Sequence, residues 1–103
     1  MGDPDEVWLP AEELQTMFNE LGFYERVQAG ELRERVFKHH VTQPDWSPEP
    51  LYRQMARYYD GDTLVAVVNQ WQRFNGTLAA SGRPDPKKIF VDGKVYWTGQ
   101  RSE

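Results

Sequence analysis

The sequence contains no cysteine, which excludes a disulfide framework and any metal site built on thiolates. No apolar run approaches the roughly 18 residues that a membrane-spanning helix needs, and the first residues lack the basic start and apolar stretch of a secretory signal. A chain without cysteine suits a reducing compartment, so we expect a cytoplasmic protein without membrane contact.

Lysine and arginine are missing from the first 25 residues, which carry seven carboxylates. Residues 26–103 have a net charge of +3, so the overall charge of −4 comes from the acidic head. This split predicts an acidic element that docks on a basic partner, with Glu12, Glu13 and Glu20 as candidate partner-binding residues. The alternative is that the head only solubilises the domain or packs across its own basic surface.

Histidine is scarce, and the two histidines, His39 and His40, are adjacent. Neighbouring side chains point to opposite sides of a strand and about 100° apart on a helix, so the pair cannot form a metal site alone. No third ligand stands at a useful spacing, and we expect neither a metal nor another cofactor. One histidine could act as a general base, although an ordinary surface position is the simpler interpretation.

Aromatic residues are plentiful, at 14% of the chain, and their burial lets a domain of 103 residues form a core. We expect one α+β domain over residues 1–103, with an acidic arm at 1–9, a proline-rich linker at 42–50 and a frayed tail at 99–103. The sheet is predicted as an antiparallel meander of about four strands in residues 52–98. One or two N-terminal helices should pack on one of its faces.

Residues 10–21 have the pattern of an amphipathic helix. Apolar residues recur at helical spacing from Leu14 to Leu21, Pro10 suits the first helical position, and Gly22 ends the run. The segment that follows is ambiguous. Oppositely charged residues four apart favour a helix at 31–39, whereas the stretch RVFKHHV is rich in strand formers. We predict a helix for 31–39.

The second half of the chain has the pattern of a sheet. Five consecutive apolar residues, 64–68, predict a central strand that is covered on both faces. Further on, Asp92-Gly93 is a preferred two-residue hairpin turn, which sets Phe90 opposite Val95.

The stretch NQWQRF at 69–74 is a candidate contact surface. Strand alternation places Trp71 and Arg73 on one side, where the pair suits stacking on a base or on a partner's aromatic ring. We predict both as partner-binding residues. The alternative is that Trp71 belongs to the core.

Residues 81–88, SGRPDPKK, form a second candidate site. Pro84 and Pro86 stiffen the segment, and Arg83, Lys87 and Lys88 lie close together in it. A rigid loop bearing cations could hold a phosphate or a carboxylate with little ordering cost. A structural corner with solvated charges explains the prolines as well, so both interpretations stay open.

Residues 57–97 resemble a set of short bacterial and phage proteins. The likeness rests on an apolar strand, an aromatic and polar stretch, and the loop Ser-Gly-Arg-Pro-Asp-Pro-Lys at 81–87 before a last hairpin. In that set a histidine is frequent where this chain has Asn69. The resemblance implies no activity, and it leaves the acidic N-terminal part uncovered.

Together these patterns predict a small non-enzymatic interaction or regulatory protein, in its specific form a phage- or mobile-element-encoded inhibitor that binds a host macromolecule. The expected partner is another protein, with nucleic acid as the second class, bound through the 81–88 loop. The alternative function is a small metal-independent ribonuclease or toxin-like enzyme with a histidine base and the loop cations. The third is a phage structural or assembly protein.

Overall fold

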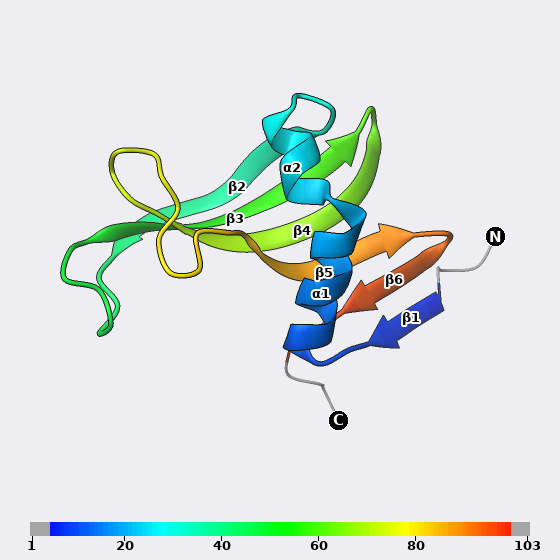
Figure 1. Ribbon diagram of the computed structural model, residues 1–103, viewed down its shortest axis with the longest axis horizontal. Helices are drawn as coiled ribbons and strands as arrows, with labels where there is room; N and C mark the ends of the chain where they lie inside the picture. The colour runs from blue at the N-terminus through cyan, green and yellow to red at the C-terminus, as the bar shows by residue number, and fades with distance from the viewer. Residues whose placement is uncertain (1–4, 100–103) are drawn as a thin grey trace.

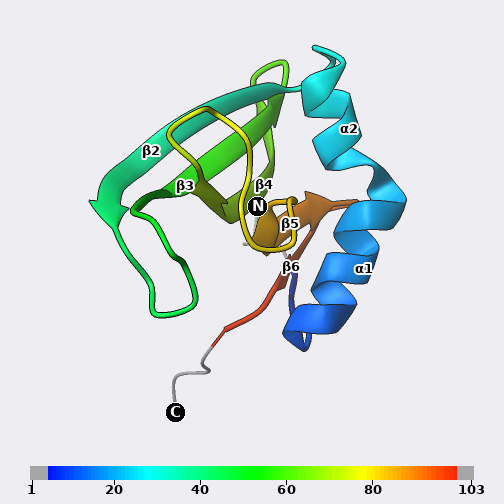
Figure 2. The ribbon, with the colours of Figure 1, turned by 60° about the vertical axis from the view of Figure 1, so that its left-hand side comes forward.

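The protein was analysed as a computed structural model, which describes residues 5–99. The elements are β1 (Asp5–Trp8), α1 (Ala11–Leu21), α2 (Phe23–Gln28), β2 (Arg33–Thr42), β3 (Leu51–Asp60), β4 (Thr63–Gln72), β5 (Asp85–Val91) and β6 (Lys94–Trp97). The strands form one sheet in the order β1-β6-β5-β4-β3-β2, and the two helices cover one of its faces (Figures 1 and 2). The predicted α+β class is confirmed.

The antiparallel meander predicted in residues 52–98 is confirmed as β3, β4, β5 and β6, which pair in that order. The described sheet is larger than predicted, because β1 and β2 add two strands and the parallel β1 makes it mixed. The strand β1 lies inside the segment predicted as an acidic arm and pairs in parallel with β6. Four residues that pair with the far end of the chain leave no local signal in the sequence. Of the predicted tail at 99–103, residues 100–103 lie outside the described part of the chain, as do residues 1–4 of the arm.

The predicted helix at 31–39 is also wrong, because these residues belong mainly to β2. Strand β2 pairs antiparallel with β3 from Arg33 opposite Tyr59 to Thr42 opposite Leu51. A few surface ion pairs stabilise a helix by only about 0.3–0.5 kcal/mol each, so β-branched and aromatic residues beside a ready sheet edge decide the outcome. The linker predicted at 42–50 is the β2–β3 loop, and only Thr42 belongs to the strand instead.

The predicted amphipathic helix is confirmed as α1, which follows Pro10. Leu14 and Phe18 are fully buried against the sheet. Gly22 ends α1 in the left-handed conformation, with φ of 66°, and α2 begins at once with the buried Phe23. The kink turns the Phe23 ring edge-on to that of Phe18, with centroids 6.0 Å apart.

The core lies between the helices and one face of the sheet. In β4, Ala66 and Val68 are fully buried on this side, whereas Val67 between them is only half-buried. The prediction that this strand is covered on both faces is therefore corrected: β4 is central, but the helices lie on one side only. We call the covered side the helix face and the opposite side the open face.

The predicted Asp92-Gly93 turn is confirmed, with Phe90 opposite Val95 and positive φ at both turn residues. Irregular pairing interrupts three of the strand pairs, and such bulges increase the local twist and bend the sheet. The far ends of β2, β3 and β4 extend beyond the helices, and the 43–50 and 73–84 loops lie at that end (Figure 1). The residues at this projecting end include several of the candidate functional residues described below.

Candidate functional site

The three cations of the 81–88 loop do not converge on one point. Arg83 turns toward the helices: it forms an ion pair with Glu25 at 2.7 Å, bonds Asn19 at 3.2 Å and lies over the Tyr24 ring. Lys87 pairs with Asp85 at 3.0 Å. The loop therefore acts as a fixed corner, in keeping with Pro84 and Pro86, whose side chains are fully buried.

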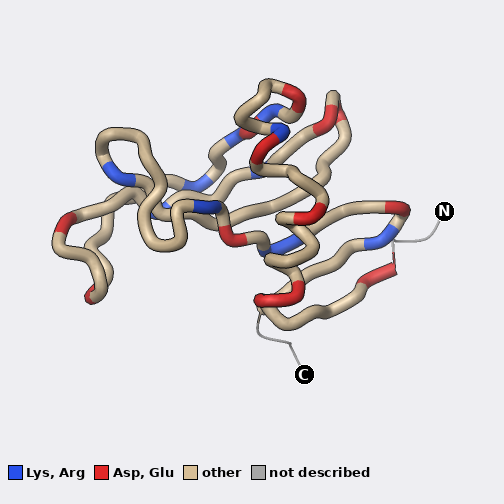
Figure 3. The backbone as a smooth tube through the Cα atoms, viewed as in Figure 1, with Lys and Arg blue, Asp and Glu red and all other residues tan. Residues whose placement is uncertain are grey.

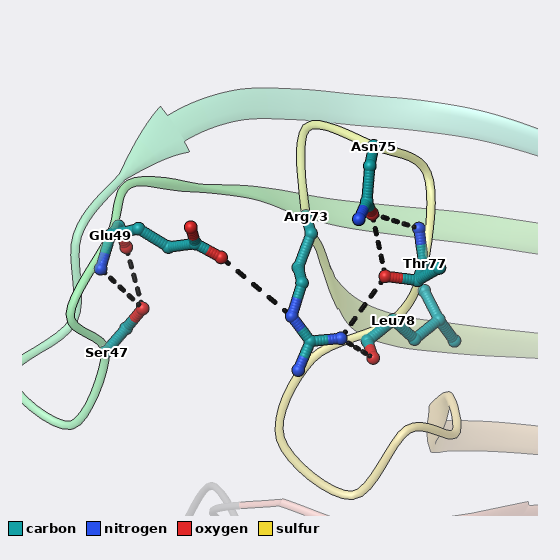
Figure 4. Close-up of polar contacts among 6 residues, drawn as sticks. All are labelled: Ser47, Glu49, Arg73, Asn75, Thr77 and Leu78. Atoms are coloured by element: carbon teal, nitrogen blue, oxygen red, sulfur yellow. Dashed lines mark hydrogen bonds and ion pairs between the residues drawn. The ribbon is translucent and has the colours of Figure 1, made fainter.

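The guanidinium of Arg73, predicted to act beside Trp71, is engaged by the neighbouring loops. Its Nη1 donates to the carbonyl oxygen of Leu78 at 2.7 Å and to Thr77 Oγ1 at 3.3 Å, and its Nε lies 3.9 Å from a Glu49 carboxylate oxygen. Figure 4 shows how these contacts tie the 73–79 turn to the 43–50 loop. Arg73 is a positioning residue here, because its guanidinium is already engaged.

The predicted acidic residues Glu12, Glu13 and Glu20 are exposed on α1. Together with the exposed Glu25 of α2 they belong to the helix layer and not to the open face of the sheet, and Figure 3 shows acidic segments along this layer. The structure does not bring them together with Trp71.

His39 and His40 point to opposite faces of the sheet, as alternation predicts, since they pair with Gln54 and Arg53. On the helix face, Gln70 Nε2 donates to Gln54 Oε1 at 2.7 Å, which leaves Gln54 Nε2 to donate to His39 Nδ1 at 3.0 Å. In this arrangement the Nδ1 lone pair of a neutral His39 ring is engaged by the Gln54 amide.

The ribonuclease alternative needs a histidine beside the loop cations. Strand β2, which carries both histidines, is separated from β5 by β3 and β4. At about 4.8 Å per strand, this separation is roughly 14 Å. Among residues 5–99, no group of three His, Asp or Glu side chains lies close enough to hold a metal ion.

Glu34, which is exposed on the edge strand β2, pairs across the sheet with the fully buried Tyr58. Partial burial raises the pKa of Glu34, and the Gln70 amide acts in the opposite direction. Burial, with a smaller effect of the Glu34 charge, raises the pKa of Tyr58, whose hydroxyl has no hydrogen-bond partner within the described chain.

We predict that Glu34→Gln is more stable than the wild type near neutral pH. A carboxyl with a raised pKa destabilises the fold when ionised, so the advantage should shrink as the pH falls toward the usual value of 4.5. Glu25 is the matched control, because the hydrogen bond from Arg83 lowers its pKa. Glu25→Gln should therefore lower stability near neutral pH. Urea unfolding of both variants, near neutral pH and near pH 4.5, shows whether the two substitutions change the free energy of unfolding in opposite directions. Equal effects of both substitutions would contradict the assignment.

A continuous row of side chains crosses the open face. Directly opposed residues share a sheet face, and the pairing of all six strands aligns one residue from each. From β1 to β2 the row reads Trp8, Trp97, Lys88, Val67, Arg57 and Arg35. It spans about 24 Å at the usual strand spacing, with tryptophans at one end and arginines at the other.

More cations flank this row, and we call the whole set the basic face. It consists of Arg33, Arg35, Lys38, Arg53, Arg57 and Lys88. Within residues 5–99 none of them forms an ion pair, whereas the cations that do, Arg26, Arg73, Arg83 and Lys87, are not part of this set.

Aromatic rings support three of these arginines. The Arg57 guanidinium lies 4.0 Å from the centre of the Phe37 ring, Arg33 lies 4.9 Å from that of Tyr59, and Arg53 lies 5.5 Å from that of Trp71. A ring beneath a guanidinium holds it in place by cation–π attraction while its N–H edges stay available to an anion. The arrangement fits an anionic, partly aromatic ligand.

Sequence reasoning missed most of this surface because residues 31–39 were assigned to a helix. Once β2 and β3 are strands, the signal is visible: Arg33 and Arg35 are two residues apart, and Arg53 and Arg57 are four apart, so each pair points to one side. Of the predicted anion-binding cations, only Lys88 lies in the row.

The chain matched no protein-family model, and neither a curated protein nor a solved structure was found to be similar to it. The resemblance of residues 57–97 to phage proteins therefore stays a prediction. No helix within residues 5–99 is long and apolar enough to span a membrane.

Proposed function

We propose that the protein is a non-enzymatic nucleic-acid-binding domain that contacts its ligand through the basic face. The observation that carries this proposal is that no cation of the basic face forms an ion pair within residues 5–99, whereas Arg26, Arg73, Arg83 and Lys87 are paired with carboxylates. Phosphate groups supply the missing counter-charge, and most nucleic-acid affinity comes from such contacts.

The charge distribution supports the same orientation. Glu12, Glu13, Glu20 and Glu25 lie on the helix layer, which a polyanion avoids, and the cations of the basic face lie on the other side of the sheet. Such a separation steers a polyanion to one surface despite the overall charge of −4. The function remains that of an interaction protein, but its contact surface moves from the acidic helix to the sheet.

Nucleic acid fits the basic face better than an acidic protein does, because the face offers rings as well as charges. Half-buried Tyr59, Phe37 and Trp71 stand beside the cations and can meet bases. An acidic peptide would use the cations alone.

The proposal predicts that the wild type binds a fluorescently labelled oligonucleotide of about 20 nucleotides. The affinity should fall steeply between about 50 and 200 mM NaCl. Fluorescence anisotropy measures both, and unlabelled polyglutamate of similar charge serves as the competitor. Binding that polyglutamate displaces as well as unlabelled oligonucleotide does would assign the face to an acidic protein. Absence of oligonucleotide binding at low salt would also contradict the proposal.

A further inference from the structure

The 43–50 loop holds a large aromatic side chain in the open. Trp46 is 54% exposed, although a side chain as large and apolar as tryptophan is usually stabilised by burial. The loop around it is ordered by its own hydrogen bonds: Ser47 Oγ donates to the Glu49 carbonyl oxygen at 2.7 Å, and Gln43 Nε2 donates to that of Ser47 at 3.1 Å. The exposed ring therefore stands on a structured support.

A second tryptophan stands beside it on the open face. The Trp46 and Trp71 rings are perpendicular, at 89°, with centroids 5.5 Å apart, and Arg53 lies over the Trp71 ring. Two perpendicular rings form a corner, in which a planar group stacked on one ring presents its edge to the other. The Glu49–Arg73 contact helps to hold the corner, because it links the 43–50 loop to the turn after β4 (Figure 4).

We infer that this corner, defined by Trp46 and Trp71, binds an unpaired base, so that the ligand of the basic face is single-stranded nucleic acid. The inference rests on the proposed function and adds the form of the ligand. Bases in a duplex are stacked on their neighbours, so a tryptophan cannot reach their faces without breaking the stack. Bases in a single strand offer those faces freely, and stacking tolerates any sequence.

A nucleic-acid strand bound on the basic face would also be able to reach this corner. Trp71 is opposite Arg53 on β3, and Arg53 precedes Arg57 by four residues on the same side of that strand. Arg53 and Arg57 are about 13 Å apart along β3, so a nucleic-acid backbone that follows this strand from Arg57 would reach the two rings. Phosphate contacts give the affinity, and the corner selects for unpaired bases.

The test compares oligothymidylate of about 20 nucleotides with a duplex of the same number of phosphates, by anisotropy at equal salt. The wild type should bind the single strand more tightly. Trp46→Ala should weaken single-strand binding about tenfold and leave duplex binding unchanged, and Trp46→Phe should keep most of the affinity because it keeps a ring.

Phe74→Ala is the matched control, because Phe74 is 59% exposed and stacks on Tyr52, a residue of the helix face. Its removal should leave both affinities unchanged. Equal binding of strand and duplex, with no effect of Trp46→Ala, would overturn the inference while the proposed function stands. Absence of binding to either ligand at low salt would overturn both.

Discussion

Replacing Phe18 with alanine is expected to lower the free energy of unfolding by about 3–5 kcal/mol. Its ring is fully buried at the centre of the core, 6.0 Å from the centroids of both Phe23 and Tyr58. Removing it leaves a cavity where α1, α2 and the sheet meet, and the surrounding rings cannot all collapse into it. A domain of this size has only about 5–15 kcal/mol of stability in total, so much of it would be lost.

Denaturation by urea, followed by circular dichroism, measures this loss. Phe74→Ala removes the same side chain from an exposed position, 59% accessible, and should change stability by less than about 1 kcal/mol. If the two substitutions cost the same, the packing of the helices on this face of the sheet would be wrong.

Reversing two charges in the open-face row is expected to have the largest effect on binding. Arg35→Glu with Arg57→Glu should weaken oligonucleotide binding by about 100-fold or more, because each change removes a phosphate contact and adds a repulsive charge. The two arginines are opposite each other on β2 and β3, at the edge of the sheet, and neither is ion-paired within residues 5–99. Anisotropy at low salt measures the change.

Lys94→Glu is the control for each single reversal. Lys94 is exposed at the start of β6 and lies outside the basic face, so its substitution changes the net charge equally. A general charge effect would weaken binding similarly in all three single variants. If the basic face contacts the oligonucleotide, Arg35→Glu and Arg57→Glu should weaken binding strongly, and Lys94→Glu should weaken it little. Unchanged circular dichroism spectra show that all three variants are folded.

The parts of the fold that the sequence predicted correctly are those with local signals. Helix α1 carries its apolar period and its terminal glycine within twelve residues, and the Asp92-Gly93 turn sets its own register. Such features need no knowledge of a distant partner. The same holds for the opposite orientation of His39 and His40, which follows from alternation alone.

The parts that could not be predicted depend on pairing across the chain. Strand β1 exists because β6 offers an edge, and β2 is a strand because β3 lies beside it. The basic face could be seen only once β2 is a strand beside β3, since its residues come from β2, β3 and β5.

The 81–88 loop shows the opposite error. Three cations close in sequence suggested a shared anion-binding site. In the structure, however, Arg83 forms an ion pair with Glu25, and Lys87 forms one with Asp85. Closeness along the chain says little about convergence, because successive residues of a strand point to opposite faces.

The central claim is that the basic face meets phosphate groups, and the salt dependence of binding tests it most directly. For the wild type, the logarithm of the affinity should fall linearly with the logarithm of the salt concentration, with a slope set by the number of phosphates contacted. In the Arg35→Glu, Arg57→Glu double variant the slope should become shallower by about 2, while Lys94→Glu keeps that of the wild type. An unchanged slope in the double variant would contradict the account.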